Sequence, residues 1–386
     1  MNLRDSPEEA AFREELRAFF AERLPDGLRD HRGGEARYDS DAIRDWSRTL
    51  QEAGYAGLTW PVAYGGGGRR PSFQAIYFEE EAQAGAPGHI GVIGLGMAGP
   101  TIIAYGTDAQ KTRHLTSILS AEEIWCQGFS EPDAGSDLAA VRTSARREGD
   151  LFVLDGQKVW SSFAHIADFC ILLTRSEPDS SRHEGLTYMI VDMRSPGVEV
   201  RPLRQITGEA EFNEIFFSGV EVPVENVLGK IGEGWQVAMT TLLHERGTLG
   251  FALVARLEIS VRKLIELARD RGATAAQREA IGREWIELQG VKHAAYRSLS
   301  ALEREGIPGP EGSILKLHWS ESNQRLTKLA LELLGPDAGL QGESAPYRGW
   351  WQHQQLRSRG NTIEAGTSEV LRSIVAERVL GLPRSR

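Results

Sequence analysis

The chain has 386 residues, of which 41% are hydrophobic and 25% are charged, as expected for a globular protein of two or three domains. Its formal net charge of -10 argues against general binding to nucleic acids or anionic membranes, although a local basic cluster can still hold a polyanionic ligand. Two cysteines, a charged N-terminus and the lack of an apolar run of about 20 residues predict a cytoplasmic protein without a disulfide framework, signal peptide or membrane span.

Residues 1–124 are predicted to form an N-terminal helical domain. Ser6, Pro7 and Glu9 form a helix start in which Ser6 is the cap, Pro7 takes the first position and Glu9 completes a capping box. Two later segments have an amphipathic helical pattern, YDSDAIRDWSRTLQEAGY and PSFQAIYFEEEAQAG.

The segment GLGMAG, Gly94 to Gly99, matches the dinucleotide-binding pattern G-x-G-x-x-G. That pattern works only after a strand and within alternating strands and helices, and neither is clear in this part of the sequence. Close helix packing or an ordinary loop is therefore the favoured interpretation, and a nicotinamide site is the alternative.

Residues 125–234 are predicted to form a central β domain. Asp155-Gly156 lies between two short apolar runs and is a hairpin signal. The strands expected after it are FCILLTRS, LTYMIVDM, VEVRPL and NEIFFSGVEVP.

Residues 235–386 are predicted to form a C-terminal helical bundle. A long helix starts near Trp235, two more helical patterns cover roughly 278–305 and 312–335, and a last helix begins near Thr367. The predicted order is helices, then strands, then helices.

The segment from Trp125 to Val141, WCQGFSEPDAGSDLAAV, is dense in small and hydroxyl residues, so its backbone amides can approach a planar ligand or a phosphate. The literal string resembles the flavin-binding signature of the acyl-CoA dehydrogenase family. Four further segments resemble that family in the same order: WPVAYGGGG, DGQKVWSSFAHIADF, FNEIFFSGVEVPVENVLGKIGEGW and AGTSEVLRSIVAERVLGLP. The resemblance implies a mainly α fold with a central, barrel-like β domain and a C-terminal four-helix bundle.

The resemblance also implies an FAD-dependent enzyme that dehydrogenates an acyl-CoA thioester at its α and β carbons. The Ser130 hydroxyl and nearby amides would bond the pyrimidine edge of the flavin, Trp160 would pack on the ring, and Ser162 would reach toward the flavin N5. Ser136 would hold phosphate or line the acyl-CoA channel. The residues assigned to FAD are Gln127, Phe129, Ser130, Ser136, Trp160, Ser162, Arg271, Glu332, Gly335, Thr367 and Glu369. No metal ligand is assigned.

Two segments depart from the family pattern where a neighbouring subunit would contact FAD. The Arg-x-x-Phe-Gly arm is reduced to RDRGAT, with Arg269 and Arg271 as candidates, and the usual glutamine and paired glycines are replaced by Glu332 and Gly335-Pro336. We expect a homodimer or homotetramer, with a hetero-oligomer as the alternative, and an electron acceptor such as an electron-transfer flavoprotein.

The reaction needs a carboxylate base for the α-proton and donors for the thioester oxygen. In the medium-chain type of the family the base directly precedes the Gly-Thr pair, but Ala365 occupies that position and only its backbone amide can contribute, as an oxyanion donor. Glu364 is one residue out of register and is the alternative base. Glu245 matches the base of the isovaleryl type, and Leu249 on the apolar stripe four residues later predicts that Glu245 faces inward. Arg246 is assigned to substrate binding.

Other interpretations remain open at this point. Glu245 could instead form an ion pair on its helix, and the chain could be a non-catalytic flavin-binding subunit that needs a paralogous partner. A flavin oxidase or monooxygenase on the same fold is a further alternative. A base on the long helix leaves an alanine-sized space near the reacting carbons, so branched or bulky acyl groups should be tolerated.

Overall fold

The computed structural model describes residues 4–29, 41–306 and 309–384, without the side chains of 245–249 and 343. The chain divides into two compact units. The first contains Met1–Gly34, Arg70–Pro87 and Arg246–Arg386, and the second contains Glu35–Arg69 and Gly88–Glu245. The boundary falls inside the long helix α6 (Gly234–Arg271).

The first unit consists of helices. Ser6 caps its first helix as the sequence predicts: the Glu9 amide donates to the Ser6 hydroxyl, and the Glu9 carboxylate accepts from the Ser6 amide. Beyond its part of α6, the main helices of this unit are α1 (Pro7–Arg23), α3 (Pro71–Ala84), α7 (Ala275–Glu305), α8 (Gly312–Leu334), α9 (Trp350–Asn361) and α10 (Ser368–Ile374).

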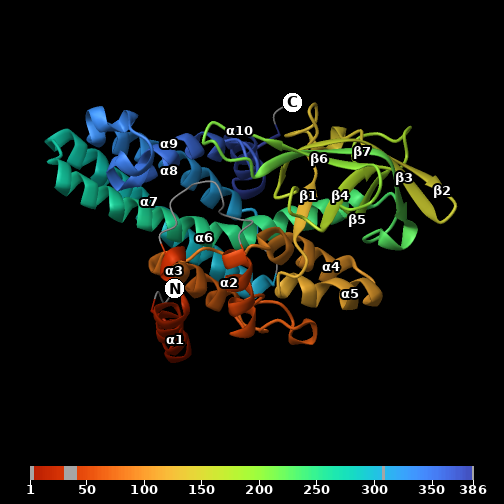
Figure 1. Cartoon of the computed structure of the whole chain (residues 1–386), viewed down its shortest axis with the longest axis horizontal. Coiled ribbons are helices and arrows are strands. Elements are labelled where there is room, and N and C mark those ends of the chain that lie inside the picture. Colours follow the sequence, from red (N-terminus) through yellow and green to blue (C-terminus); the bar gives the residue numbers. More distant parts are fainter. Residues whose placement is uncertain (1–3, 30–40, 307–308, 385–386) are drawn as a thin grey trace. The chain divides into compact units, whose positions relative to one another are not determined.

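Leucine side chains from α6, α7 and α8 form the core of the bundle, with Leu264, Leu288 and Leu326 all fully buried. The buried Trp351 of α9 closes this core, and α7, α8 and α9 run side by side (Figure 1). Helix α9 is a finding of the structure, because its sequence WWQHQQLRSRGN lacks the regular apolar spacing that marks an amphipathic helix.

The helices of the second unit are α2 (Asp41–Glu52), α4 (Gly99–Tyr105), α5 (Asp108–Leu119) and the start of α6. The GLGMAG segment is a π-helical turn (Gly94–Ala98) that continues directly into α4, so it is not a strand-to-helix phosphate loop. A side-chain carbon at Gly99 would come within 2.1 Å of the Trp60 ring, which supports the interpretation of this segment as close helix packing.

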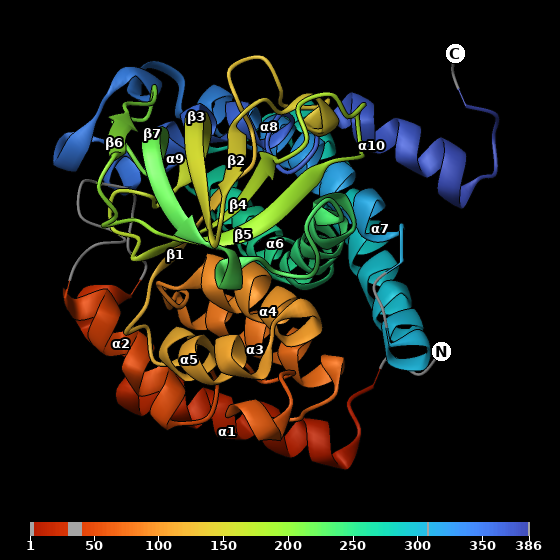
Figure 2. The same ribbon diagram turned by 90° about the vertical axis from the view of Figure 1, so that its right-hand side faces the viewer.

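Among the described residues of the second unit, seven strands form the sheet: β1 (Trp125–Gly128), β2 (Ser144–Glu148), β3 (Leu151–Ser162), β4 (Phe169–Arg175), β5 (Leu186–Asp192), β6 (Val198–Leu203) and β7 (Phe212–Pro223). Their order is β1-β4-β2-β3-β7-β6, with β5 paired to β4. In Figure 2 β2, β3 and β7 lie next to one another. Strand β4 is buried on both faces, because Ile171 packs in one hydrophobic cluster and Cys170 in the other.

The predicted hairpin at Asp155-Gly156 is wrong. Strand β3 runs through these residues, and the hairpin between β2 and β3 turns at Gly149-Asp150 instead. Gly156 is required for a different reason: a side-chain carbon there would lie 2.7 Å from Thr143, and the pairing of β3 with β7 shifts register at this point. The apolar runs on either side therefore belong to one bulged strand.

The described residues contain no helix that is both long and apolar enough to cross a membrane.

Candidate active site

The first predicted flavin segment begins in strand β1 and continues beyond its end. Gly128 has no room for a side chain, because a carbon there would lie 2.6 Å from Leu172 and 3.0 Å from the Cys170 sulfur. Phe129 turns its ring into the core, edge-on to Tyr188 at 5.7 Å between centroids, so only its backbone can serve a cofactor. Gln127 is half-buried, and its side-chain nitrogen has no hydrogen-bond partner among the described residues.

The second predicted flavin segment is the end of strand β3. Trp160 has a φ of 61°, in the left-handed region, and its side chain is 61% exposed. The register of β3 against β7 shifts between Lys158 and Ser161, which accounts for this outward turn. The Phe212 ring lies edge-on to the Trp160 ring, at 6.1 Å between centroids. The neighbouring Ser161 hydroxyl is buried and has no hydrogen-bond partner among the described residues.

The structure brings these two segments together. The Val159 amide donates to the Ser130 carbonyl at 2.9 Å, so Ser130 lies next to the strand that ends in Trp160 and the half-buried Ser162. An exposed indole face beside unsatisfied polar atoms suits a planar, polar-edged ring such as a flavin. The residues present therefore fit the predicted cofactor.

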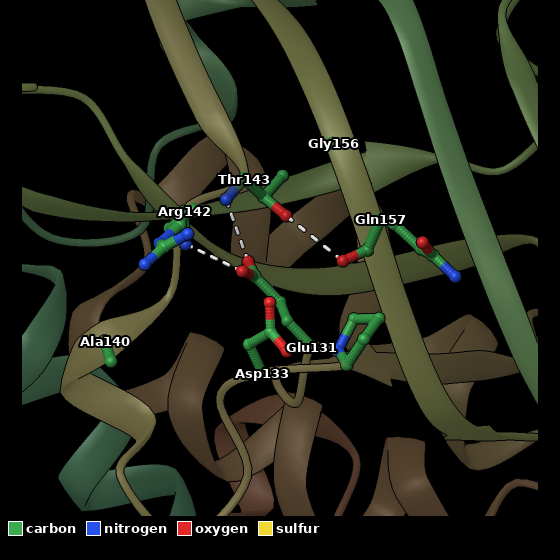
Figure 3. Close-up of a pocket in the computed structure, with 8 residues that line it drawn as sticks. Glu131, Asp133, Ala140, Arg142, Thr143, Gly156 and Gln157 are labelled. Carbon is green, nitrogen blue, oxygen red and sulfur yellow. Dashed lines mark hydrogen bonds between the residues drawn. The ribbon is translucent and has the colours of Figure 1, made fainter.

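A buried ion pair, which the sequence analysis missed, connects the same segments. The Lys158 ammonium donates to a Glu131 carboxylate oxygen at 2.8 Å and to the Phe129 carbonyl at 3.0 Å. The Glu131 carboxylate also accepts from the backbone amides of Arg142 and Thr143, at 2.7 and 2.8 Å (Figure 3). The available signal was the alternation along β3, in which Lys158 takes an even position like the buried Phe152 and Leu154, since a lysine in such a place is buried only with a partner.

The charges of this pair stabilise each other against burial. Burial acts to raise the pKa of Glu131, but Lys158 and the hydrogen bonds from Lys158, Thr143 and Arg142 together hold that pKa below its usual value. Burial lowers the pKa of Lys158, and Glu131 opposes the effect. The carboxylate is therefore ionised at neutral pH.

A cavity of about 350 Å³ lies beside the Glu131 carboxylate (Figure 3). Its lining residues are Glu131, Pro132, Asp133, Ala140, Arg142, Thr143, Gly156 and Gln157. None of the residues assigned to FAD lines this cavity, so we do not identify it with the flavin site. Ser136 is exposed in the turn after Gly135, where Asp137 lies 3.7 Å from Arg182.

The carboxylate of Glu364, the alternative base, is hydrogen-bonded to the end of helix α9. It accepts two hydrogen bonds from Arg357, at 2.8 and 3.2 Å, and one from Asn361 at 2.8 Å. The next residue, Ala365, is exposed and has a φ of 50°. The buried Lys316 holds this turn from α8 by donating to the carbonyls of Asn361 and Gly366, at 2.8 and 2.7 Å.

The backbone amides around this turn differ in whether they donate a hydrogen bond to a backbone carbonyl. Those of Glu364 and Ser368 donate to backbone carbonyls of the turn, whereas that of Ala365 takes part in none of these bonds. Thr367 is the N-cap of α10, as predicted, and accepts from the Val370 amide at 3.2 Å. Glu369 is exposed in the first turn of α10, where hydrogen bonds from its own backbone amide and from the Thr367 hydroxyl lower its pKa.

The residues predicted to contact a neighbouring subunit's FAD have local roles in this chain. Arg271 pairs with Asp337 at 2.8 Å, and Gly335 ends α8 with a φ of 57°. Glu332 is exposed near the end of α8. Arg269 lines a second cavity of about 380 Å³ together with Arg278.

The proposed base and its neighbour, Glu245 and Arg246, lie in helix α6, but their side chains fall outside the described residues. One helical turn earlier, the buried Thr241 hydroxyl forms hydrogen bonds with Thr101 at 2.8 Å and with Tyr188 at 3.0 Å. These contacts fix the start of α6 against α4 and β5.

Three sequence families match the chain: the N-terminal domain of acyl-CoA dehydrogenase at residues 6–122, the middle domain at 126–220 and the C-terminal domain at 232–380. Acyl-CoA dehydrogenase IpdE1 of Mycobacterium tuberculosis is 40% identical over 384 residues, which cover 97% of each chain. The solved structure titled "Tcur3481-Tcur3483 steroid ACAD" is 33% identical and covers 100% of both chains, with a TM-score of 0.89. The structure of the ChsE4-ChsE5 complex from Mycobacterium tuberculosis is 31% identical with the same coverage and a TM-score of 0.88.

These matches confirm the predicted fold class, the predicted enzyme class and FAD as the cofactor. From the three domain matches, the near full-length relatives and the flavin-type segments of the second unit, we conclude that the chain belongs to the acyl-CoA dehydrogenase family.

Proposed function

We propose that this acyl-CoA dehydrogenase takes the α-proton of its substrate with Glu245 of helix α6. The Ala365 amide donates to the thioester oxygen, and Ser130, Trp160 and Ser162 hold the flavin. Held by these residues, FAD would supply the acceptor for the hydride that leaves the β-carbon of the acyl group.

The observation that best supports Glu245 as the base is that the Glu364 carboxylate is already hydrogen-bonded. A general base must reach the substrate proton with a free carboxylate oxygen. The Glu364 carboxylate accepts three hydrogen bonds from Arg357 and Asn361, which hold it against the end of α9. Ala365 has no group that can take a proton, so the family's two base positions leave Glu245 as the remaining carboxylate.

The chain's other residues then have separate tasks. An amide without a partner in its turn, as at Ala365, can stabilise the negative charge that develops on the thioester oxygen. The contacts of Thr241 with Thr101 and Tyr188 hold the first turns of α6 and thereby orient the backbone of Glu245. In this arrangement the α-proton moves from the substrate carbon to a Glu245 carboxylate oxygen.

For the substrate, we propose an acyl-CoA with a bulky, ring-bearing acyl group. The side chain at position 365 is a methyl group, which leaves space that a carboxylate fills in the medium-chain type. A full-length structural relative at 33% identity is titled a steroid enzyme. Arg246 and Ser136 remain the proposed contacts to the acyl-CoA substrate.

A second candidate is an enzyme that needs a different partner chain for activity. The Arg271–Asp337 ion pair favours it, because the arginine proposed for a neighbour's FAD is used within its own chain. The titles of two full-length structural relatives each name two chains. An electron-transfer flavoprotein remains the proposed electron acceptor in both cases.

The proposal is tested by mixing the purified, FAD-loaded protein with ring-bearing and straight-chain acyl-CoAs without oxygen and following the flavin absorbance. Bleaching with a preference for the ring-bearing substrates supports the proposal, and a strong preference for straight medium chains contradicts the substrate class. A chain that binds FAD but is not bleached until a paralogous chain is added supports the partner-dependent candidate. Rapid reoxidation of the bleached flavin by molecular oxygen would instead indicate an oxidase.

A further inference from the structure

The Lys158–Glu131 pair is buried in the second unit, and only Glu131 borders the neighbouring cavity. The Lys158 side chain is 0% exposed and that of Glu131 is 8% exposed, and the lysine stem packs close to Gly128. Burial of two charges is unfavourable unless each finds partners of good geometry, and a similar apolar pair is often as stable. Because such a pair adds little to stability, the backbone segments that it holds in place are the more informative feature.

The pair joins three stretches of backbone. Lys158 binds the Phe129 carbonyl and the Glu131 carboxylate, and the same carboxylate binds the amides of Arg142 and Thr143. The loop after β1 is thus fixed at both its ends to strand β3. An apolar residue at either position would leave the Phe129 carbonyl or the two loop amides unsatisfied, at a cost in stability.

The same two stretches contain the residues proposed to hold the flavin. Ser130 lies between Phe129 and Glu131, and its carbonyl accepts from the Val159 amide next to Lys158. Trp160 is two residues beyond Lys158 and keeps a left-handed φ of 61°, which a residue other than glycine retains only when its surroundings hold it. Lys158 is anchored to Glu131 and the Phe129 carbonyl two residues before this strained position.

We propose that Lys158 and Glu131 are positioning residues for FAD, which set the spacing between Ser130 and the Trp160–Ser162 segment before the cofactor binds. Neither side chain is placed to touch the flavin: Lys158 is fully buried, and the Glu131 carboxylate accepts three hydrogen bonds, from the Lys158 ammonium and from the amides of Arg142 and Thr143. This inference rests on the proposed flavin site.

The test compares variants of similar burial. Glu131→Gln and Lys158→Met remove one charge each from the pair. Glu80→Gln is the matched control, because the buried Glu80 also accepts several hydrogen bonds, from Arg13 and Arg17, but joins α1 to α3 and contacts no residue assigned to FAD. For each apoprotein, the FAD dissociation constant, the absorbance spectrum of the bound flavin and the melting temperature are measured.

Glu131→Gln and Lys158→Met should weaken FAD binding roughly 10- to 100-fold and shift the flavin spectrum, and the double variant should be no worse than the weaker-binding single variant. Glu80→Gln should lower the melting temperature yet leave FAD affinity within about twofold of the wild type. If both variants bind FAD like the wild type and with an unchanged spectrum, the positioning role is refuted. A wild-type protein that binds no FAD would refute the proposed function instead.

Hydrogen exchange of the wild-type protein gives a test that does not depend on a variant's folding. The amides of Arg142, Thr143 and Val159 should exchange slowly in the FAD-free protein, because the pair fixes them before the cofactor arrives. If these amides exchange freely without FAD and become protected only when it binds, the cofactor orders the segments and the inference is wrong.

Discussion

Lowering the pH from 7 to 5 should destabilise the second unit through the imidazole of His89. The Nε2 atom of this ring lies 3.1 Å from the Leu119 carbonyl and therefore carries the proton, while Nδ1 accepts from the Gly91 amide at 2.9 Å. Protonation of Nδ1 would abolish the bond from Gly91 and place a charge in a poorly hydrated site. Burial accordingly lowers the pKa of His89 to about 4, and the bond to Leu119 opposes this only in part.

The sign of the effect follows from proton uptake. In the unfolded chain the histidine has its ordinary pKa of about 6.5, so between pH 6.5 and pH 4 the unfolded state binds a proton that the folded state does not. Stability is therefore lost as the pH falls through this window. A folded pKa of about 4 corresponds to a loss of about 2 kcal/mol at pH 5, which is an upper bound because the ring is only half-buried.

The assay is thermal unfolding of the wild type and His89→Gln at pH 7, 6 and 5. Glutamine can donate to Leu119 and accept from Gly91 but does not titrate, so other acid effects cancel in the difference between the two proteins. The wild type should lose several degrees more than the variant between pH 7 and pH 5. Equal pH dependence of the two melting temperatures would refute the reasoning.

Two further predictions concern packing in the same unit. Gly99→Ala should destabilise the protein by about 1–3 kcal/mol and lower its melting temperature, because the new carbon would meet the Trp60 ring at 2.1 Å. Gly96→Ala is the control, because Gly96 has open space around it and the melting temperature should not change. Equal melting temperatures of the two variants would contradict this reasoning. The thiols of Cys126 and Cys170 are fully buried, and burial raises the pKa of Cys126. A thiol reagent should therefore react with neither cysteine in the folded protein and with both after denaturation. Rapid reaction of the native protein would contradict this and show that the sheet opens.

Local signals in the sequence predicted the elements that depend on local contacts. The capping box of Ser6 and the cap at Thr367 need only a few neighbouring residues, and both are present. The hairpin signal at Asp155-Gly156 failed because a glycine is needed at position 156 to leave room for Thr143. No short sequence pattern reveals that contact. Tertiary packing decided that position.

The candidate site divides in the same way. The family motif located Ser130 and Trp160, but the left-handed backbone of Trp160 depends on a register shift between β3 and β7 that the residues alone do not specify. Lys158 and Glu131 are 27 residues apart and meet only in the folded sheet. The hydrogen bonds that hold the Glu364 carboxylate likewise come from a different element, the preceding helix, which contains Arg357.

The identity of the base is the central claim, and anaerobic flavin reduction in two variants tests it most directly. Glu245→Gln should keep FAD bound but slow reduction by acyl-CoA roughly 10²–10⁴-fold, the usual contribution of a positioned general base. Glu364→Gln should slow it far less, because that carboxylate is bound to Arg357 and Asn361. If Glu364→Gln is the inactive variant and Glu245→Gln is reduced at the wild-type rate, the assignment of the base is wrong.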